Sequence, residues 1–100
     1  MVNYKQIAKE LNIVPEDLIN NGTMAFLEKE LRLAEADIAD IRERYGVLSK
    51  EELEKKIKKG AIPAHPAWED LIQWENLEEH KKRIASILTE LDAYSPESAI

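Results

Sequence analysis

The 100-residue sequence contains no cysteine, only three glycines and only four prolines. Without cysteine the chain can form neither a disulfide framework nor a thiolate metal site. It also lacks a run of 18 apolar residues, which a membrane-spanning helix would need. The first residues, MVNYKQIAKEL, have no apolar core of the kind found in signal peptides. We therefore expect a cytoplasmic protein that does not enter a membrane.

The sequence also lacks the patterns that accompany catalysis or cofactor binding. There is no glycine-rich phosphate loop and no serine nucleophile elbow. Adjacent carboxylates, such as Glu51 with Glu52, flank amphipathic segments and not a pocket that would separate their pKa values. His65 and His80 lie outside any spacing that would place several metal ligands on one helix face. These absences predict a protein that is not an enzyme and that binds no cofactor and no metal.

Acidic residues outnumber basic ones, and the formal net charge of −6 is spread over both halves of the chain. Such a chain is a poor general binder of nucleic acid or of an anionic membrane. Basic residues gather in one place, on a predicted short helix. They are Lys55, Lys56, Lys58 and Lys59. This lysine cluster either contacts phosphates or an acidic protein, or forms a solvated helix end, and no aromatic residue interleaves with it for base stacking.

Apolar residues recur between residues 24 and 48 in alternating steps of three and four, which is an unbroken heptad pattern. They are Met24, Leu27, Leu31, Ala34, Ile38, Ile41, Tyr45 and Leu48. The pattern predicts a helix of roughly 22 residues, about 33 Å long. Because burying each leucine or isoleucine contributes about 1.5–3 kcal/mol, this seam must pack against another helix. We interpret Leu27, Leu31, Ala34, Ile38, Ile41 and Tyr45 as a core or dimer seam.

Capping signals define the helices before this seam. A short helix is expected over residues 3–11, ended by Asn12, which tolerates the left-handed conformation. A second helix begins at Pro15, which suits the first turn. It either breaks at residues 20–22 or continues into the seam. We favour the break, with Thr23 as the cap of the long helix, because Gly22 would cost about 1 kcal/mol inside a helix.

The C-terminal half shows equally clear boundaries. Gly46 is expected to end the long helix. Ser49 and Glu52 form a capping box that starts a third helix over about 50–59. A proline at the first position begins the last helix, which we place at about 66–92. Residues 93–100 are expected to form a frayed tail.

These elements predict an all-α fold with a single helical domain over residues 1–92. Two long helices joined by a connector of roughly 20 residues, which holds a short helix, favour an antiparallel hairpin. A lone hairpin leaves its flanks exposed to water. A symmetric homodimer that closes into a helical bundle is therefore the economical assembly.

Two tryptophans lie six residues apart in the last helix, at Trp68 and Trp74. Six residues correspond to about 240° around a helix, so the two rings face different surfaces. Either one tryptophan packs in the core and the other in an interface, where tryptophan is favoured, or both are core residues of a dimer. We take Trp68, Gln73, Trp74 and Leu77 as a possible partner interface.

The segment from Ile7 to Arg32, IAKELNIVPEDLINNGTMAFLEKELR, resembles the two helices of ribbon–helix–helix proteins. That family binds DNA through an N-terminal strand, of which MVNY leaves at most a stub. The resemblance implies a transcriptional regulator that uses its first 30 residues. A helix-turn-helix reading of YKQIAKELNIVPEDL is a further alternative, with an acidic second helix that suits phosphate poorly.

The order of motifs along residues 1–92 is similar to that of small archaeal and bacterial helical antitoxins. It consists of Arg44-Tyr45-Gly46, Ser49-Lys50-Glu51-Glu52-Leu53, Lys58-Lys59-Gly60 and Trp68-Glu69-Asp70-Leu71. The resemblance implies a dimer that binds and neutralises a small toxin, often a ribonuclease-like neighbour. Three hypotheses follow: an antitoxin that covers its partner, a DNA-binding regulator, and a structural helical oligomer.

Overall fold

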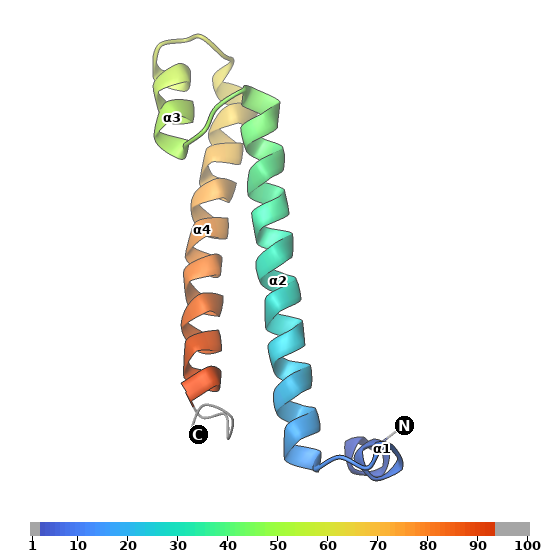
Figure 1. Cartoon of the computed structure of the whole chain (residues 1–100). Coiled ribbons are helices and arrows are strands. Elements are labelled where there is room, and N and C mark those ends of the chain that lie inside the picture. Colours follow the sequence, from blue (N-terminus) through green and yellow to red (C-terminus); the bar gives the residue numbers. More distant parts are fainter. Residues whose placement is uncertain (1–2, 94–100) are drawn as a thin grey trace.

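The computed structural model describes residues 3–93, which form four helices and no strand. The helices are α1 (Tyr4–Leu11), α2 (Pro15–Tyr45), α3 (Lys50–Lys58) and α4 (Ala64–Ala93). The long helices α2 and α4 run antiparallel, and α3 packs against α4 at the end where the chain turns back (Figure 1). The predicted all-α hairpin is confirmed. Within the described part of the chain, no helix is long and apolar enough to cross a membrane.

The helices end where local chemistry predicts. Asn12 follows α1 with a left-handed backbone, at φ 59°, and Gly46 follows α2 at φ 62°. The Ser49 hydroxyl accepts a hydrogen bond from the Glu52 backbone N–H at 3.2 Å. The Glu52 carboxylate accepts one from the backbone N–H of Leu48 at 3.0 Å, so the capping box is present with its return arm one residue earlier than usual.

The last helix begins as expected. His65 has an extended backbone (φ −111°, ψ 127°), so the continuous helical part of α4 starts at Pro66. The helix continues to Ala93, one residue beyond the predicted limit. The rest of the expected frayed tail, residues 94–100, lies outside the described residues.

The expected break before the seam is wrong. Helix α2 passes through residues 20–22 without interruption, and Thr23 lies inside the helix instead of capping it. Gly22 lowers helix stability by about 1 kcal/mol, but breaking the helix there would also remove backbone hydrogen bonds on both sides of it. The continuous helix of 31 residues is therefore the better solution.

The core lies at the closed end of the hairpin, where α2, α3 and α4 meet. Its buried members are Ile38, Ile41, Val47, Leu53, Leu71 and Trp74. The predicted seam divides accordingly: Ala34, Ile38 and Ile41 are buried, whereas Leu27 and Leu31 are half-buried. Tyr45 packs against the edge of the core. Leu48, which we counted in the seam, is 83% exposed because Gly46 ends the helix before it.

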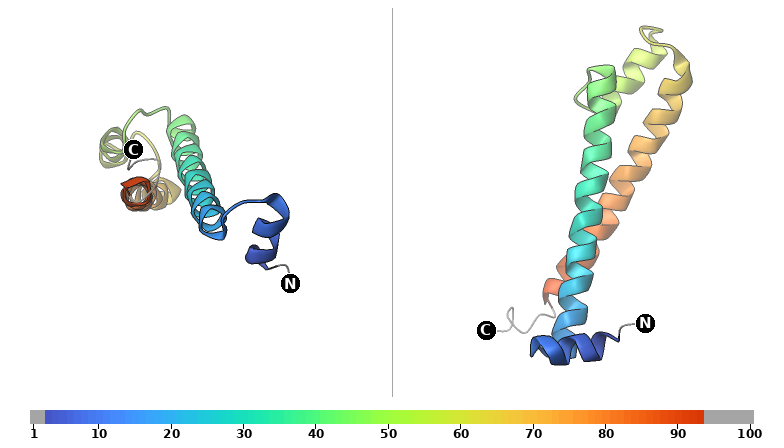
Figure 2. Two further views of the ribbon diagram at one scale, coloured as in Figure 1. Left: turned by 60° about the horizontal axis from the view of Figure 1, so that its bottom comes forward. Right: turned by 90° about the vertical axis from the view of Figure 1, so that its right-hand side faces the viewer.

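Helix α1 lies across the N-terminal end of α2, on the side away from α4 (Figure 2). Its main contacts with the rest of the chain are with α2, and Ala8 is its one buried residue. The resulting molecule is long and flat, 60 × 34 × 16 Å along its principal axes. One end is a packed three-helix unit, and the other is a narrower helix pair with α1 attached.

Candidate interaction surfaces

Ionic contacts hold the closed end of the hairpin together. The Asp70 carboxylate on α4 accepts hydrogen bonds from the Arg44 guanidinium, at 2.9 Å, and from the Tyr45 hydroxyl. Burial raises the pKa of the Tyr45 hydroxyl, and its hydrogen bond to Asp70 raises it further. The same carboxylate raises the pKa of Arg44. On the α3 side, Lys50 pairs with Glu78 at 3.2 Å, which raises the pKa of Lys50.

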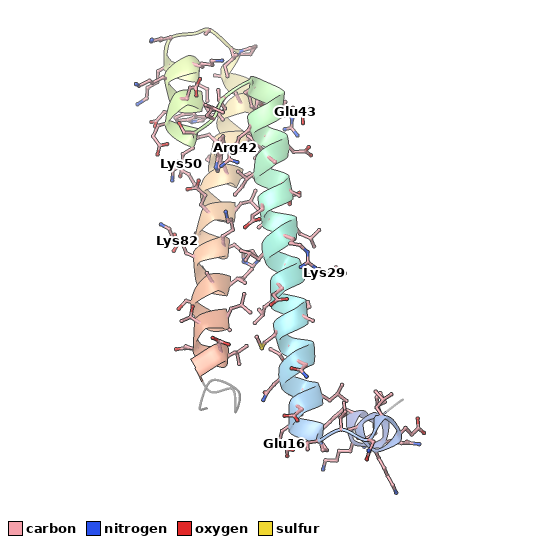
Figure 3. The ribbon with its side chains drawn as sticks, in the orientation of Figure 1. Glu16, Lys29, Arg42, Glu43, Lys50 and Lys82 are labelled. Atoms are coloured by element: carbon pink, nitrogen blue, oxygen red, sulfur yellow. The ribbon has the colours of Figure 1, made fainter. Side chains whose placement is uncertain are left out.

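Trp74, the aromatic side chain at the centre of this end, also has polar partners. The Trp74 indole N–H donates to the Glu78 carboxylate at 3.0 Å, and the Arg42 guanidinium lies 5.6 Å from the centroid of the Trp74 ring. In Figure 3, Arg42 lies between α2 and α4. A cation over the face of a tryptophan ring is attracted by its quadrupole. These groups fix the relative positions of α2, α3 and α4, so we assign them a structural role.

Outside this end the titratable groups are dispersed over the surface. Within residues 3–93 no charged or polar residue is buried, and no group of three potential metal ligands is found. The His65 Nδ1 atom lies 3.6 Å from a carboxylate oxygen of Glu69, and the His80 Nε2 atom lies 3.9 Å from one of Glu30. All four side chains are exposed or partly exposed.

The four residues that we took as a partner interface do not share a surface. Trp74 is fully buried, and Leu77 packs against the same core. Trp68 and Gln73 are exposed, but five residues place them about 140° apart around α4. The prediction is therefore wrong for the fully buried Trp74, because that side of α4 faces α2 and α3. Leu77 is half-buried, and its part in an interface stays a prediction. The alternative of one core and one exposed tryptophan describes the single chain.

Trp68 belongs instead to an apolar patch on the outer face of α4. Its neighbour one turn on is Ile72, and the two side chains are 45% and 52% exposed. We call these two residues the Trp68 patch. The same face continues through Glu75 and Glu79 at helical spacing, and both are exposed. Glu69, also exposed, follows Trp68 directly, so acidic groups border the patch.

The lysine cluster is partly engaged within the chain. The Lys56 ammonium donates to the backbone carbonyl of Tyr45 at 3.3 Å, near the C-terminus of α2. Lys58 pairs with Glu54 at 3.0 Å along α3. Lys55 and Lys59 are exposed. The cluster thus includes one lysine that stabilises the end of α2 and does not present four equivalent cations.

A second apolar surface, which the sequence reading missed, follows the outer face of α2. Ile19, Phe26 and Leu33 lie seven residues apart and are 45%, 60% and 49% exposed. We call these three residues the outer stripe. Its direction is about 90° around the helix from the buried positions of the seam. The seven-residue spacing of these side chains is present in the sequence, but the longer heptad pattern of the seam on the same helix is easier to recognise.

Comparison with known proteins places the chain among its relatives. It is 38% identical over 78 residues to a protein of the archaeon Methanocaldococcus jannaschii described as "Uncharacterized protein MJ0235". The aligned region covers 78% of this chain and 94% of that relative. No solved structure matches the chain significantly. The matching family extends over residues 1–95, so the chain belongs to the Uncharacterized protein MJ0235 family.

Proposed function

We propose that the protein is a non-enzymatic binding module that covers a basic surface on a partner protein. The observation that carries this proposal is the Trp68 patch with its acidic border. A large aromatic side chain that stays 45% exposed beside another exposed apolar residue is the usual composition of an interface centre. Trp68 is not part of the buried core of its own chain, whereas Trp74 is.

Charge defines the kind of partner. Glu69, Glu75 and Glu79 surround or extend the Trp68 patch, and the chain carries a formal net charge of −6. Acidic groups around an apolar centre steer a basic partner into place and disfavour an acidic one. A protein whose working surface binds RNA has the required basic character. An antitoxin that masks such a toxin is therefore the specific form of the proposal.

DNA binding through the N-terminal residues is the competing function. Helix α2 begins with Glu16 and Asp17 in its first turn, where a phosphate would otherwise approach the helix N-terminus. Helix α1 carries Lys5 and Lys9 but is only eight residues long. These features give the N-terminal region little electrostatic attraction for a duplex, so we favour the protein partner.

The test is a binding measurement with the product of the neighbouring gene, by calorimetry on the two purified full-length chains. We expect Trp68→Ala to weaken the complex at least about 30-fold, because a tryptophan at an interface centre contributes about 2 kcal/mol or more. Ile87→Ala is the matched control, since Ile87 is an exposed apolar residue elsewhere on α4. Equal losses in the two variants, or none in Trp68→Ala, would contradict the assignment of the patch.

A salt titration with duplex DNA separates the two functions. The proposal expects binding weaker than about 10⁻⁶ M at physiological salt. Tighter binding with a steep dependence on salt would favour the regulator. Rescue of growth when this chain is co-expressed with a toxic neighbour would identify the antitoxin form.

A further inference from the structure

The N-terminal end of the molecule leaves several apolar side chains exposed. The outer stripe lies on α2, and to it are added Leu11 at the end of α1 and Ile13 and Val14 in the segment that joins α1 to α2, all exposed. An isolated helix of eight residues, such as α1, is far below the length that is stable in water by itself. Within the chain α1 buries only Ala8, so most of its surface is open to further contacts.

The total exposed surface is large enough to supply a subunit interface. The chain exposes 7649 Å². A compact monomer of its mass, 11.5 kDa, exposes about 5,800 Å². The difference is roughly twice the 800 Å² or so that each partner contributes to an ordinary stable interface. The radius of gyration, 19.6 Å, also exceeds the value of about 13 Å expected for a compact domain of 100 residues.

We propose that the outer stripe is a homodimer interface on which a second copy of this chain lies antiparallel, with the two-fold axis beside Phe26. The spacing of the stripe supports this symmetry, because Ile19 and Leu33 are equally distant from Phe26, about 10.5 Å along the helix on either side. In the dimer Phe26 meets its own copy, and Ile19 faces Leu33 of the partner subunit. Figure 3 shows Lys29 and Glu43 pointing from α2 away from α4. The outer stripe lies between this direction and the seam, about 90° around the helix from the seam.

Charge disfavours the parallel orientation, and the symmetric spacing of the stripe favours the antiparallel one. Asp37 and Asp40 continue the face of the outer stripe toward the closed end, and both are exposed. A parallel pair would place each aspartate opposite its own copy, and opposed like charges destabilise an interface. In the antiparallel pair, Asp37 and Asp40 no longer face their own copies but lie near the start of α2 in the partner subunit, whose first turn carries Glu16 and Asp17. Helix α1 of that subunit, with Lys5 and Lys9, is attached there.

This dimer goes beyond the proposed function and does not depend on it. The Trp68 patch lies on α4 and the outer stripe on the exposed side of α2, so both surfaces can be occupied in one assembly. A dimer would then present two Trp68 patches. Loss of dimerisation and loss of partner binding are separately measurable.

The first test is sedimentation equilibrium on the full chain, with circular dichroism as the check of folding. We expect a dimer with a dissociation constant below about 10 µM and a Phe26→Ser variant at least about 100-fold weaker with unchanged helix content. Ile87→Ser, which changes an exposed apolar residue on α4, should remain dimeric. If Phe26→Ser does not fold, Leu33→Ser provides the same measurement at another member of the stripe. A monomeric wild type at about 100 µM, or dimers of equal affinity in stripe and control variants, would overturn the proposal.

The second test determines orientation by disulfide cross-linking, for which a chain without cysteine is well suited. Ile19→Cys and Leu33→Cys chains are purified separately, mixed and oxidised. The antiparallel dimer predicts that the mixture forms a disulfide between the two different variants, because this arrangement places residue 19 of one chain opposite residue 33 of the other. A parallel dimer would cross-link each variant to itself and would overturn the proposed arrangement.

The Phe26→Ser chain should still bind the product of the neighbouring gene if the Trp68 patch acts alone.

Discussion

The closed end of the hairpin and its N-terminal end are built from the same kind of sequence but are completed differently. At the closed end three helices converge on Trp74, Ile38 and Leu53, and each of these side chains is buried. At the other end α2 has α1 on one side and α4 on the other, and Phe26 remains 60% exposed. The difference is one of partners, because α3 supplies the third wall of the core at only one end.

This contrast indicates which part of the molecule folds by its own contacts. Burial at the closed end stabilises that unit at any protein concentration. Stability gained from a second chain depends on concentration, because association acts by mass action. The comparison is therefore tested by substitutions that affect one end and leave the other unchanged.

The largest expected effect separates the two tryptophans. Trp74→Ala leaves a large cavity among Ile38, Leu53 and Leu71, and should lower the free energy of unfolding by about 3–5 kcal/mol. Trp68→Ala removes a side chain that is 45% exposed, and should change it by no more than about 0.5 kcal/mol. Urea denaturation followed by circular dichroism measures both. Similar losses in the two variants would show that the exposed patch is part of the core.

The boundaries of the fold were predictable from local chemistry. Asn12, Gly46, Ser49 and Pro66 each mark a helix end by a conformation or hydrogen bond that depends on a few neighbouring residues. Gly22 was misjudged because its intrinsic cost of about 1 kcal/mol is small beside the hydrogen bonds of a continuous helix.

The candidate surfaces were less predictable, because they depend on which helix faces stay uncovered. Helical spacing placed Trp68 and Trp74 on different sides but did not tell which one faces the core. That choice depends on how α2 and α3 pack on α4, and the path of the loops that bring them there is not encoded in any periodicity. Phe26 lies outside the heptad pattern of the seam, so the longer seam on the same helix drew attention away from it.

The second prediction concerns the hydrogen bond between Tyr45 and Asp70. Tyr45→Phe should lower the free energy of unfolding by about 1 kcal/mol at neutral pH, because Asp70 loses one of its two donors. The folded pKa of Tyr45 is raised, so the contribution of this bond is fully present below the unfolded value near 10. It is lost as the pH rises through the raised folded pKa, where the phenolate can no longer donate and repels the carboxylate.

Urea denaturation at several alkaline pH values checks this dependence. Lysine side chains, Lys50 among them, lose their charge in the same direction, so the wild-type curve contains more than one contribution. Tyr45→Phe isolates the tyrosine: the difference between the two chains should shrink as the pH rises. A difference that stays constant at high pH would mean that the hydroxyl does not donate to Asp70 in solution.

The third prediction tests the cap that positions α3. Ser49→Ala removes the acceptor for the Glu52 N–H and should lower the free energy of unfolding by about 1 kcal/mol. Ser86, exposed within α4, supplies the control. Ser86→Ala should leave stability unchanged or slightly higher, because alanine is the better helix former. Thermal denaturation of both variants distinguishes a capping effect from the general loss of a serine.

The smallest effect compares glycines at the two ends. Gly22 lies within α2 with no atom within 4 Å of an added Cβ, so Gly22→Ala should raise the free energy of unfolding by about 0.5–1 kcal/mol. Gly46 also has open space, but its φ of 62° is left-handed, so Gly46→Ala should lower the free energy of unfolding by about 1 kcal/mol.

Gly22 borders the outer stripe, three residues after Ile19 and four before Phe26. If a second chain packs there, the gain from Gly22→Ala should be smaller at high protein concentration than at low concentration. The loss from Gly46→Ala should be the same at both, because the closed end is completed within one chain.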